Sequence, residues 1–395
     1  MKQGWKIKKL GEVTTSINGL WTGKKPPFIT IAVIRNTNFT KDCKLDTSDI
    51  AYIDVELKQY ARRKLQCGDI IIEKSGGSDK QPVGRPILFN IEEGEYSFSN
   101  FTSTLRVNDK TATIPEFIHR YLAHIYMRGD TAAMQSKTTG IRNLDFNLYK
   151  SINIPIPPLP EQEKIVAELD CLSGVIEKKK QQLKELDALA ESIFYTMFGD
   201  PITNEKGWDV KRLGEVCYKI GDGLHGTPKY DEDGEVAFIN GNNLIDGRIV
   251  ITDRTLFVND IEAQKYKIGL NTNTILLSIN GTLGRTAIYR NENIILGKSA
   301  CYCDLNNAFL ITKFVEHLMN SLSFKGFLED NSSKSTIKNV GLKAIRNYEI
   351  ILPPLTLQQE FATKIEAIEK QKELIKESII QTEELFNSRM DYYFG

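Results

Sequence analysis

The feature that most constrains the fold of this chain is an internal repeat that covers most of its 395 residues. GWKIKKLGEV at 4–13 returns as GWDVKRLGEV at 207–216, and the proline cluster at 157–158 returns at 353–354. SIFYTMFG at 192–199 matches SRMDYYFG at 388–395, and both of these later matches are 196 residues apart. A period of this length is far longer than the 20–50 residues of a solenoid unit. The repeat therefore predicts a duplicated domain, in which each copy is followed by a similar trailing segment.

Two further boxes lie inside the large blocks of the repeat. VGRPILF at 83–89 is echoed by LGRTAIY at 283–289, and TTGIRNL at 138–144 by SKSTIKNV at 333–340. Short β-branched runs such as FITIAVIR and TILLSI are punctuated by Gly, Asn and Asp, which is typical of strands and turns. We therefore predict a first α+β block at 1–152 and a second at 200–350, separated and followed by trailing segments at 153–199 and 351–395.

Both trailing segments have the spacing of a coiled coil. Their apolar residues recur in alternating steps of four and three, which is the spacing of a coiled-coil seam. Lys179 interrupts the first seam and Lys372 the second, at different places. The alternative is a helical hairpin that packs on its own domain. The predicted seam consists of Ile165, Leu169, Leu172, Ile176, Leu183, Leu186 and Ile193 in the first copy, and Phe361, Ile365, Ile368, Ile375, Ile379 and Phe386 in the second.

The proline clusters mark where these helices begin. Proline cannot continue a strand ladder, yet it is tolerated in the first turn of a helix. Pro157 and Pro158 therefore end the extended segment SINIPI and start the first helix at a fixed angle. In the second copy, Thr356 and Gln359 have the spacing of a capping box.

The charge of the chain is unevenly distributed. The totals cancel, with 51 basic and 51 acidic residues, which alone argues against a nucleic-acid-binding protein. Residues 1–150 nevertheless carry 23 Lys and Arg against 16 Asp and Glu, whereas residues 151–200 carry 5 against 9. The first block is thus basic and the helices are acidic, so the helices are better suited to protein partners than to phosphate.

Motifs of catalysis or metal binding are missing from the sequence. It has no phosphate-binding loop, no nucleophile elbow and no HExxH helix, so we expect no catalytic or metal-binding residues. Cys301 and Cys303 alternate as on one face of a strand, which favours buried packing over zinc. Gly281–Arg285 is more typical of a hairpin than of a phosphate cradle. The scattered cysteines and the lack of a long apolar run or signal peptide predict a cytoplasmic protein without a membrane partner.

Several loops carry side chains suited to nucleic acid. Arginine pairs with guanine, Asn and Gln pair with adenine, and Lys and Arg also bind phosphates. The alternative for each Asn or Gly is that it only builds a turn. The candidate DNA-binding residues are Lys24, Lys25, Arg35, Asn36, Lys74, Lys80 and Arg85 in the first block, and His225, Lys229, Asn240, Asn242, Asn243 and Arg285 in the second.

The order of these motifs resembles the specificity (S) subunit of Type I restriction–modification systems. The resemblance rests on the WxxKKLGEV-like openings, GDGLHGTPKY, FINGNNL, GTLGR, and the proline cluster that leads into a long helix ending in FG. It implies two α+β target recognition domains joined by two long antiparallel coiled-coil helices, with a pseudo-twofold internal repeat. The first copy has INGLWTGKKPPF where the second has IGDGLHGTPKY, so we expect the two halves of the DNA site to differ.

The resemblance also implies partners. A protein of this family binds double-stranded DNA, does no chemistry and binds no cofactor itself. It docks two modification subunits that use S-adenosylmethionine, together with restriction subunits that use ATP and Mg²⁺. Two other hypotheses remain: a coiled-coil scaffold with ligand-binding β domains, and a methyltransferase acting alone, which the lack of a target-amine motif disfavours.

Overall fold

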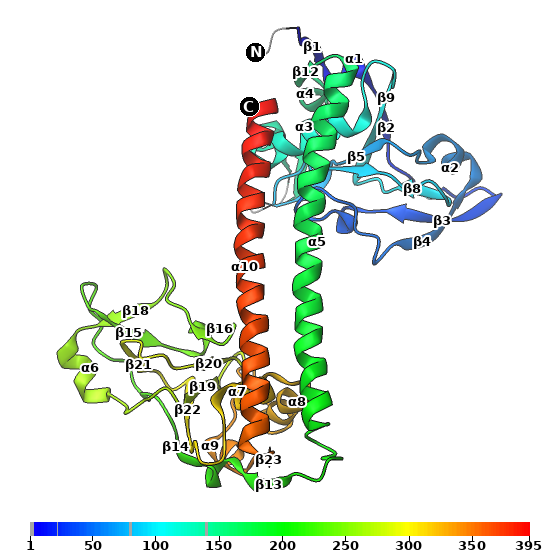
Figure 1. Ribbon diagram of the computed structural model, residues 1–395. Helices are drawn as coiled ribbons and strands as arrows, with labels where there is room; N and C mark the ends of the chain where they lie inside the picture. Colours follow the sequence, from blue (N-terminus) through cyan, green and yellow to red (C-terminus); the bar gives the residue numbers. More distant parts are fainter. Residues whose placement is uncertain (1–3, 22, 79–80, 139–140) are drawn as a thin grey trace. The chain divides into compact units, whose positions relative to one another are not determined.

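The computed structural model describes residues 4–21, 23–78, 81–138 and 141–395. The chain divides into two compact units, Met1–Lys180 with Glu377–Gly395, and Gln181–Lys376. Both boundaries fall inside the two long helices, α5 (Leu159–Phe198) and α10 (Leu355–Phe394), which are labelled in Figure 1. Each unit therefore contains one block together with half of each helix.

The first block is built on one antiparallel and one mixed sheet. A four-stranded antiparallel sheet has the order β2-β9-β5-β7, and a three-stranded sheet has the order β4-β3-β8, in which β3 and β8 are parallel. Strands β1 and β12 pair next to the start of α5, and β6 joins the hairpin β10-β11. The elements are β1 (Lys6–Lys9), α1 (Leu10–Val13), β2 (Thr14–Asn18), β3 (Phe28–Ile34), η1 (Asn36–Asn38), β4 (Ala51–Glu56), α2 (Leu57–Arg63), β5 (Asp69–Glu73), β6 (Ser75–Gly77), β7 (Pro86–Phe89), β8 (Tyr96–Phe98), β9 (Thr102–Val107), α3 (Pro115–Met127), η2 (Asp130–Met134), β10 (Gln135–Thr138), β11 (Ile141–Leu144), α4 (Phe146–Lys150) and β12 (Asn153–Ile156).

The second block repeats this topology. Its sheets β14-β22-β19-β20, β18-β15-β21 and β13-β23 correspond to β2-β9-β5-β7, β4-β3-β8 and β1-β12 of the first block, again with one parallel pair, β15 with β21. This agreement confirms the duplicated α+β domain. The elements are β13 (Asp209–Arg212), η3 (Leu213–Glu215), β14 (Cys217–Asp222), β15 (Val236–Ile239), η4 (Gly241–Asn243), β16 (Leu244–Ile245), β17 (Arg248–Ile249), β18 (Leu256–Val258), α6 (Asp260–Tyr266), β19 (Thr274–Ser278), β20 (Thr286–Ile288), β21 (Ile294–Leu296), β22 (Ala300–Leu305), α7 (Thr312–Asn320), α8 (Leu322–Asp330), α9 (Leu342–Asn347) and β23 (Glu349–Leu352).

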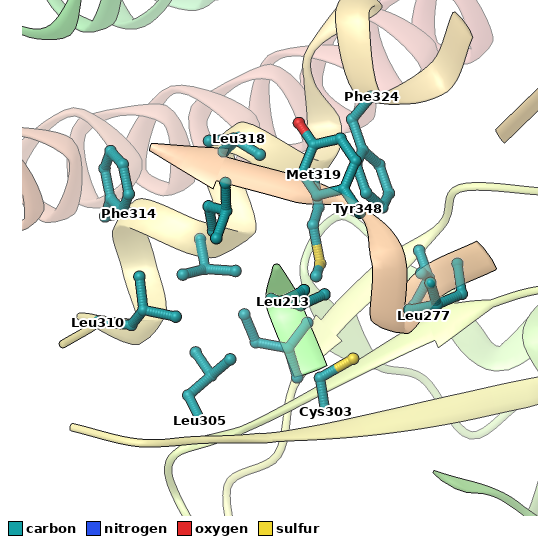
Figure 2. Close-up of a cluster of buried hydrophobic side chains, with 14 of the residues drawn as sticks. Leu213, Leu277, Cys303, Leu305, Leu310, Phe314, Leu318, Met319, Phe324 and Tyr348 are labelled. Carbon is teal, nitrogen blue, oxygen red and sulfur yellow. The ribbon is translucent and has the colours of Figure 1, made fainter. Parts of the chain in front are cut away.

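The core of the second unit lies between its four-stranded sheet and helix α7, as Figure 2 shows for Leu277, Phe314, Leu318 and their neighbours. Cys301 and Cys303 are buried on β22, where they pack as small apolar side chains. In the part of the chain that the structure describes, no three His, Cys, Asp or Glu side chains form a metal-binding group. The pair thus has the packing role that its alternation predicts.

The two long helices run antiparallel within each unit. In the first unit, Arg389 Nη2 lies 3.1 Å from Glu168 Oε2, and Lys179 Nζ lies 2.6 Å from Ser378 Oγ. In the second unit, Lys372 forms an ion pair with Asp187. Both lysines that interrupt the seam therefore have a polar partner on the other helix, which is the kind of contact that specifies register. Every predicted seam residue is buried or half-buried.

The ends of the helices are embedded in the blocks. Phe361 near the start of α10 and Phe198 at the end of α5 share the core of the second unit, with ring centroids 5.2 Å apart. Phe394 at the end of α10 packs on Phe117 of α3 in the first unit, with centroids 5.5 Å apart. Burial of each phenylalanine stabilises the fold by about 1.5–3 kcal/mol. The repeated FG box is thus explained by an aromatic anchor.

The junction between block and helix follows the proline prediction, but the capping box is wrong. Strand β12 ends at Ile156 and α5 begins at Leu159, so the prolines separate strand from helix. In the second copy the carbonyl oxygen of Pro354 accepts hydrogen bonds from the backbone nitrogens of Leu357 and Gln358, at 2.9 and 3.1 Å. Helix α10 begins at Leu355, so Thr356 lies within the helix and is not its N-cap.

None of the helices in the described ranges is both long enough and apolar enough to cross a membrane.

Candidate nucleic-acid interface

A short 3₁₀ turn follows the central strand β3 or β15 in each block and carries most of the predicted asparagines. The backbone nitrogen of Arg35 donates to Asn38 Oδ1 and that of Asn240 donates to Asn243 Oδ1, each at 3.0 Å. Asn243 Nδ2 also donates to the carbonyl oxygen of Val250 at 3.0 Å. Asn243 is only 7% exposed. The prediction that Asn243 binds DNA is therefore wrong, because all its polar atoms are used to build the turn.

The burial of Arg85 contradicts its prediction as a DNA-binding residue as well. Arg85 is 3% exposed, lies 3.1 Å from Glu73 Oε2, and donates to the carbonyl oxygen of Phe39 at 2.8 Å. Burial raises the pKa of Glu73, and the positive charge of Arg85 opposes this effect. Arg85 is thus a buried structural residue and cannot reach DNA. Its counterpart Arg285 is only half-buried.

The repeat explains why these two arginines differ. The position of Glu73 in the first copy is occupied by Ser278 in the second, since both end the equivalent strand. Ser278 Oγ accepts a hydrogen bond from the backbone nitrogen of Arg285 at 2.8 Å, which leaves the guanidinium without a buried carboxylate. Arg285 Nη1 lies 3.4 Å from the carbonyl oxygen of Asn242 instead.

The second block contains two neighbouring polar cavities, of about 860 and 250 Å³. Asn280 lines both cavities, and we call the two together the amide groove. The larger cavity is lined by Asn240, Gly241, Asn242, Asn280, Gly281, Thr282, Leu283, Ser299, Glu329, Thr336, Ile337 and Lys338, and the smaller by Asp222, His225, Ile279, Asn280, Lys298, Asn339, Val340, Gly341 and Leu342.

Three side chains in the amide groove are available for a ligand. Within the described ranges, the side-chain amides of Asn242 and Asn280 have no hydrogen-bond partner, and Lys298 has no ion-pair partner. Asn240 Oδ1, by contrast, accepts from Ser299 Oγ at 3.0 Å. Lys338 is paired with Glu329. The groove thus offers unsatisfied amides with one unpaired lysine, which suits base edges and phosphate better than a cationic or apolar ligand.

The other candidates of the second block lie close to the groove or on the exposed surface. His225 lines the smaller cavity, and its Nε2 lies 2.6 Å from Asp222 Oδ2. The Lys229 side chain is exposed, while its backbone nitrogen donates to Glu262 Oε1 at 3.0 Å.

In the first block, the structure brings Asn36 and Lys74 together but not the other candidates. Asn36 Nδ2 donates to the carbonyl oxygen of Ser75, next to Lys74, at 3.1 Å. Burial lowers the pKa of Lys74, whose Nζ lies 3.4 Å from Asn18 Oδ1. Arg35 is half-buried and lies 3.5 Å from Asp49.

The remaining candidates of the first block are three lysines. Lys24 and Lys25 have exposed side chains, and their backbone nitrogens donate to Glu56 Oε1 at 2.6 and 2.5 Å. Lys80 lies outside the described residues.

Sequence reasoning missed Asn280, Lys298 and Lys338 in the groove. Two of them belong to segments that the repeat already marks: Asn280 directly precedes the Gly281–Arg285 turn, and Lys338 lies in the box at 333–340. This turn closes the hairpin β19-β20, as expected, with positive φ at Gly281 and Gly284. The backbone nitrogen of Gly281 donates to the carbonyl oxygen of Lys338 at 2.9 Å, which brings the two boxes together.

Comparison with known proteins gives one consistent family. The family model described as Type I restriction modification DNA specificity domain matches residues 2–188 and 205–384. The specificity subunit of the Type I restriction enzyme StySPI from Salmonella potsdam is 24% identical over 398 residues, covering 93% of this chain and 82% of that protein.

Solved structures show the same fold. A chain from a type I restriction–modification system, studied for its complex assembly and conformational transition, has a TM-score of 0.61 at 20% identity, covering 100% of this chain and 98% of that one. The S subunit from M. genitalium has a TM-score of 0.58 at 13% identity, covering 99% of this chain and 97% of that one.

Proposed function

The chain belongs to the Type I restriction modification DNA specificity domain family, and from this premise we propose that each block reads one half of a split DNA site. It is a specificity protein rather than a catalytic one. The observation that carries the proposal is the amide groove, in which Asn242 and Asn280 line one cavity with unpaired amides. Asparagine pairs with the N6 and N7 edge of adenine through two hydrogen bonds. The second half-site therefore contains an A·T pair read by this groove.

The two half-sites differ in sequence. The first block has the buried Arg85–Glu73 pair and the Asn36–Ser75 contact where the second has the groove with Arg285 at its edge. Since equivalent positions carry different chemistry, the two blocks cannot make the same base contacts. The bipartite target is asymmetric.

The helices set the gap between the half-sites and bind the catalytic partners. Both unit boundaries fall within α5 and α10, so the chain passes from one unit to the other along these helices. Residues 151–200 carry an excess of acidic side chains, which favours protein over DNA as the helix partner. The partners are two modification subunits that use S-adenosylmethionine, joined by restriction subunits that use ATP and Mg²⁺.

One experiment tests the proposed function. Methylated adenines are mapped across genomic DNA from cells with and without this chain, in the presence of its modification subunit. We expect an asymmetric bipartite motif with a fixed gap that is methylated only when the chain is present. Methylation that does not depend on the chain, or that follows a continuous motif, would contradict the proposal. Methyl transfer by the purified chain alone would favour the methyltransferase hypothesis instead.

A further inference from the structure

Each block makes the same ionic contact with its own long helix. After the 3₁₀ turn the chain forms a short hairpin, closed by the bridge of Phe39 with Leu45 in the first block and by β16-β17 in the second. The basic residue just before the end of the hairpin reaches a glutamate on the helix: Lys44 pairs with Glu177, and Arg248 pairs with Glu373. Each glutamate is 18 residues after the first residue of its helix. The repeat has therefore kept one contact in both copies.

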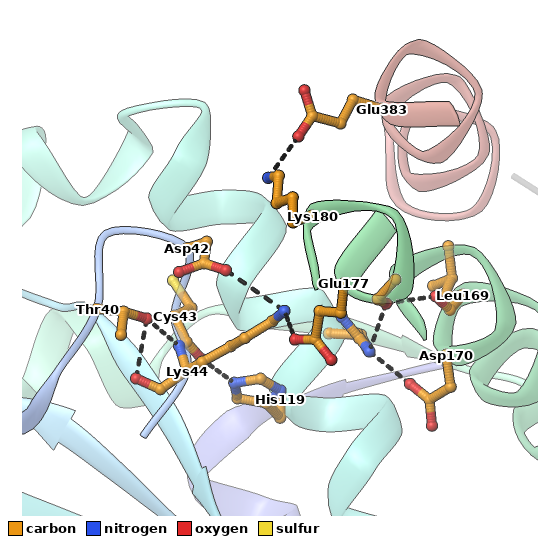
Figure 3. Close-up of polar contacts among 12 residues, drawn as sticks. Thr40, Asp42, Cys43, Lys44, His119, Leu169, Asp170, Glu177, Lys180 and Glu383 are labelled. Carbon is orange, nitrogen blue, oxygen red and sulfur yellow. Dashed lines mark hydrogen bonds and ion pairs between the residues drawn. The ribbon is translucent and has the colours of Figure 1, made fainter. Parts of the chain in front are cut away.

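The hairpin of the first block is itself held firmly, as Figure 3 shows. The backbone nitrogen of Lys44 donates to Thr40 Oγ1 at 2.9 Å, and Thr40 Oγ1 donates to the carbonyl oxygen of Lys44 at 3.0 Å. The carbonyl oxygen of Cys43 lies 3.1 Å from Nε2 of the buried His119 on α3. Lys44 thus projects from a hairpin fixed to the core of its block.

Further contacts lie one to two helical turns earlier on each helix, since Asp170 and Ser173 precede Glu177 by seven and four residues, and Glu369 precedes Glu373 by four. In the first unit, Arg120 donates to Asp170 Oδ1 at 2.5 Å and to Ser173 Oγ at 3.1 Å. In the second unit, Lys313 lies 3.0 Å from Glu369 Oε2. Each block is therefore attached to its helix by side chains from the hairpin and from α3 or α7.

The hairpin of the second block is braced in a similar way. Its turn, Asp246–Gly247, has positive φ at both residues, and Lys376 of α10 lies 3.0 Å from Asp246 Oδ2. Gly247 packs so closely that an added Cβ would lie 2.2 Å from Oε1 of Glu316, the partner of Lys313. A side chain at position 247 would therefore displace the Glu316 carboxylate and strain the turn, because φ at this residue is +74°.

These hairpins are continuous with the loops that we expect to contact DNA. Asn38 Nδ2 donates to the carbonyl oxygens of Asp46 and Asp49, at 3.1 and 2.9 Å, just after the first hairpin. Asn243 makes the equivalent bond to Val250 after the second. A movement of the hairpin along the helix would therefore carry the 3₁₀ turn with it.

We propose that the Lys44–Glu177 and Arg248–Glu373 pairs are positioning contacts, which fix each DNA-reading loop along its own helix and so determine how strictly the protein selects the gap between half-sites. The proposal rests on the DNA-reading function given above. An exposed ion pair changes an equilibrium by about fivefold at most, so its loss leaves the fold intact. The predicted effect is on gap selection rather than on stability.

The test uses the full chain with charge reversals in the first unit. Lys44→Glu breaks the pair, and Lys44→Glu/Glu177→Lys restores it with the charges exchanged. Lys41→Glu is the matched control, because Lys41 is exposed in the same loop and, among the described residues, has no ion-pair partner. With the modification subunit bound, affinity is measured for duplexes with the preferred gap and with gaps one base pair longer or shorter.

A second measurement on the free chain needs no DNA. Cys67 in the first block and Cys171 on α5 are both exposed, so spin labels on them report how the block sits on its helix. Cys217, half-buried with a thiol pKa raised by burial, is replaced by serine so that it takes no label. The distance distribution is recorded by pulsed electron paramagnetic resonance.

Each outcome has a defined meaning. We expect Lys44→Glu to lower the preference for the correct gap about two- to fivefold and to broaden the distance distribution, while the exchanged pair restores both and Lys41→Glu changes neither. An unchanged distance distribution in Lys44→Glu, or a change that the exchanged pair fails to restore, would overturn the positioning role. If the wild-type complex shows no sequence preference, the proposed function fails, whereas the distance measurement still decides whether the contact positions the block.

Discussion

The side-chain Nε2 of Gln162 donates a hydrogen bond to the carbonyl oxygen of Pro157, with 2.8 Å between the two atoms. The same Nε2 donates to the carbonyl oxygen of Ala112, and Oε1 accepts from the backbone nitrogen of Ile114. Gln358 makes the corresponding three bonds in the second copy. In each copy, one fully buried glutamine near the start of the helix thus bonds to the proline cluster and to the segment before α3 or α7. These bonds fix the junction between block and helix.

The glutamine junction predicts a large loss of stability in one variant but not in its neighbour. Gln358→Ala leaves a buried backbone group of Pro353 and part-buried ones of Phe309 and Ile311 without this partner, so we expect the free energy of unfolding to fall by about 2–4 kcal/mol. Gln359→Ala is the control, since Gln359 is exposed, and should change it by less than about 0.5 kcal/mol. Urea unfolding followed by circular dichroism measures both. Equal losses of unfolding free energy in the two variants would contradict the stabilising role of Gln358 at the junction.

Substitution of Arg85, in the box at 83–89, should affect stability more than substitution of Arg285, in the box at 283–289. Arg85→Met leaves Glu73 buried and unpaired, which costs about 3–5 kcal/mol, and Arg85→Met/Glu73→Gln should recover part of the loss. Arg285→Met should cost less than about 1 kcal/mol. Thermal unfolding separates the two. A stable Arg85→Met protein with weakened DNA binding would contradict the structural role of Arg85.

The amide groove predicts a defect confined to one half-site. Asn242→Ala and Asn280→Ala should each weaken binding of the intact target by about 1–3 kcal/mol and relax the preference at one position of the second half-site. Asn307→Ala, at an exposed position away from the groove, should leave binding unchanged. Selection from randomised duplexes by the complex with its modification subunit measures the preference at each position. A relaxed preference in the first half-site would contradict the assignment.

His119 predicts a loss of stability in mild acid. Its burial lowers the imidazole pKa to about 4, against 6.5 as the ordinary value. As the pH falls, the unfolded chain therefore takes up a proton on this residue before the folded chain does. The free energy of unfolding should fall by roughly 3 kcal/mol between pH 6.5 and about pH 4.

A variant isolates this effect. His119→Gln keeps a donor for the carbonyl oxygen of Cys43 and should reduce the loss of stability between pH 7 and pH 4.5, while the exposed His225→Gln should not. Urea unfolding at the two pH values gives the comparison. The same pH dependence in His119→Gln as in the wild type would rule out this role.

The sequence predicts those features of the fold that depend on periodicity and repetition. The duplicated blocks and the antiparallel helices follow from patterns of many residues, each of which constrains the next. The role of a single polar side chain depends on what packs against it, and this is why Arg85 and Asn243 were assigned wrongly. Arg85 lies in the same box as Arg285, and only the change from Glu73 to Ser278 at the facing strand decides which of the two is buried.

Some of the missed residues carried a detectable signal. Gln162 and Gln358 occupy the same position in both copies, directly after the proline clusters. A polar residue repeated beside buried apolar positions is a candidate for a buried hydrogen bond. Lys298 carried no such signal, because its place in the groove depends on the fold of the loops around it.

In the proposed function, the lengths of α5 and α10 set the gap between the two half-sites. The most direct test inserts four helix-forming residues at the unit boundaries, after Lys180 and after Lys376, which lengthens both helices by about 6 Å. At about 3.4 Å per base pair, the gap in the methylated motif should grow by roughly one to two base pairs, with both half-site sequences unchanged. An unchanged gap in a folded, active complex would contradict this account.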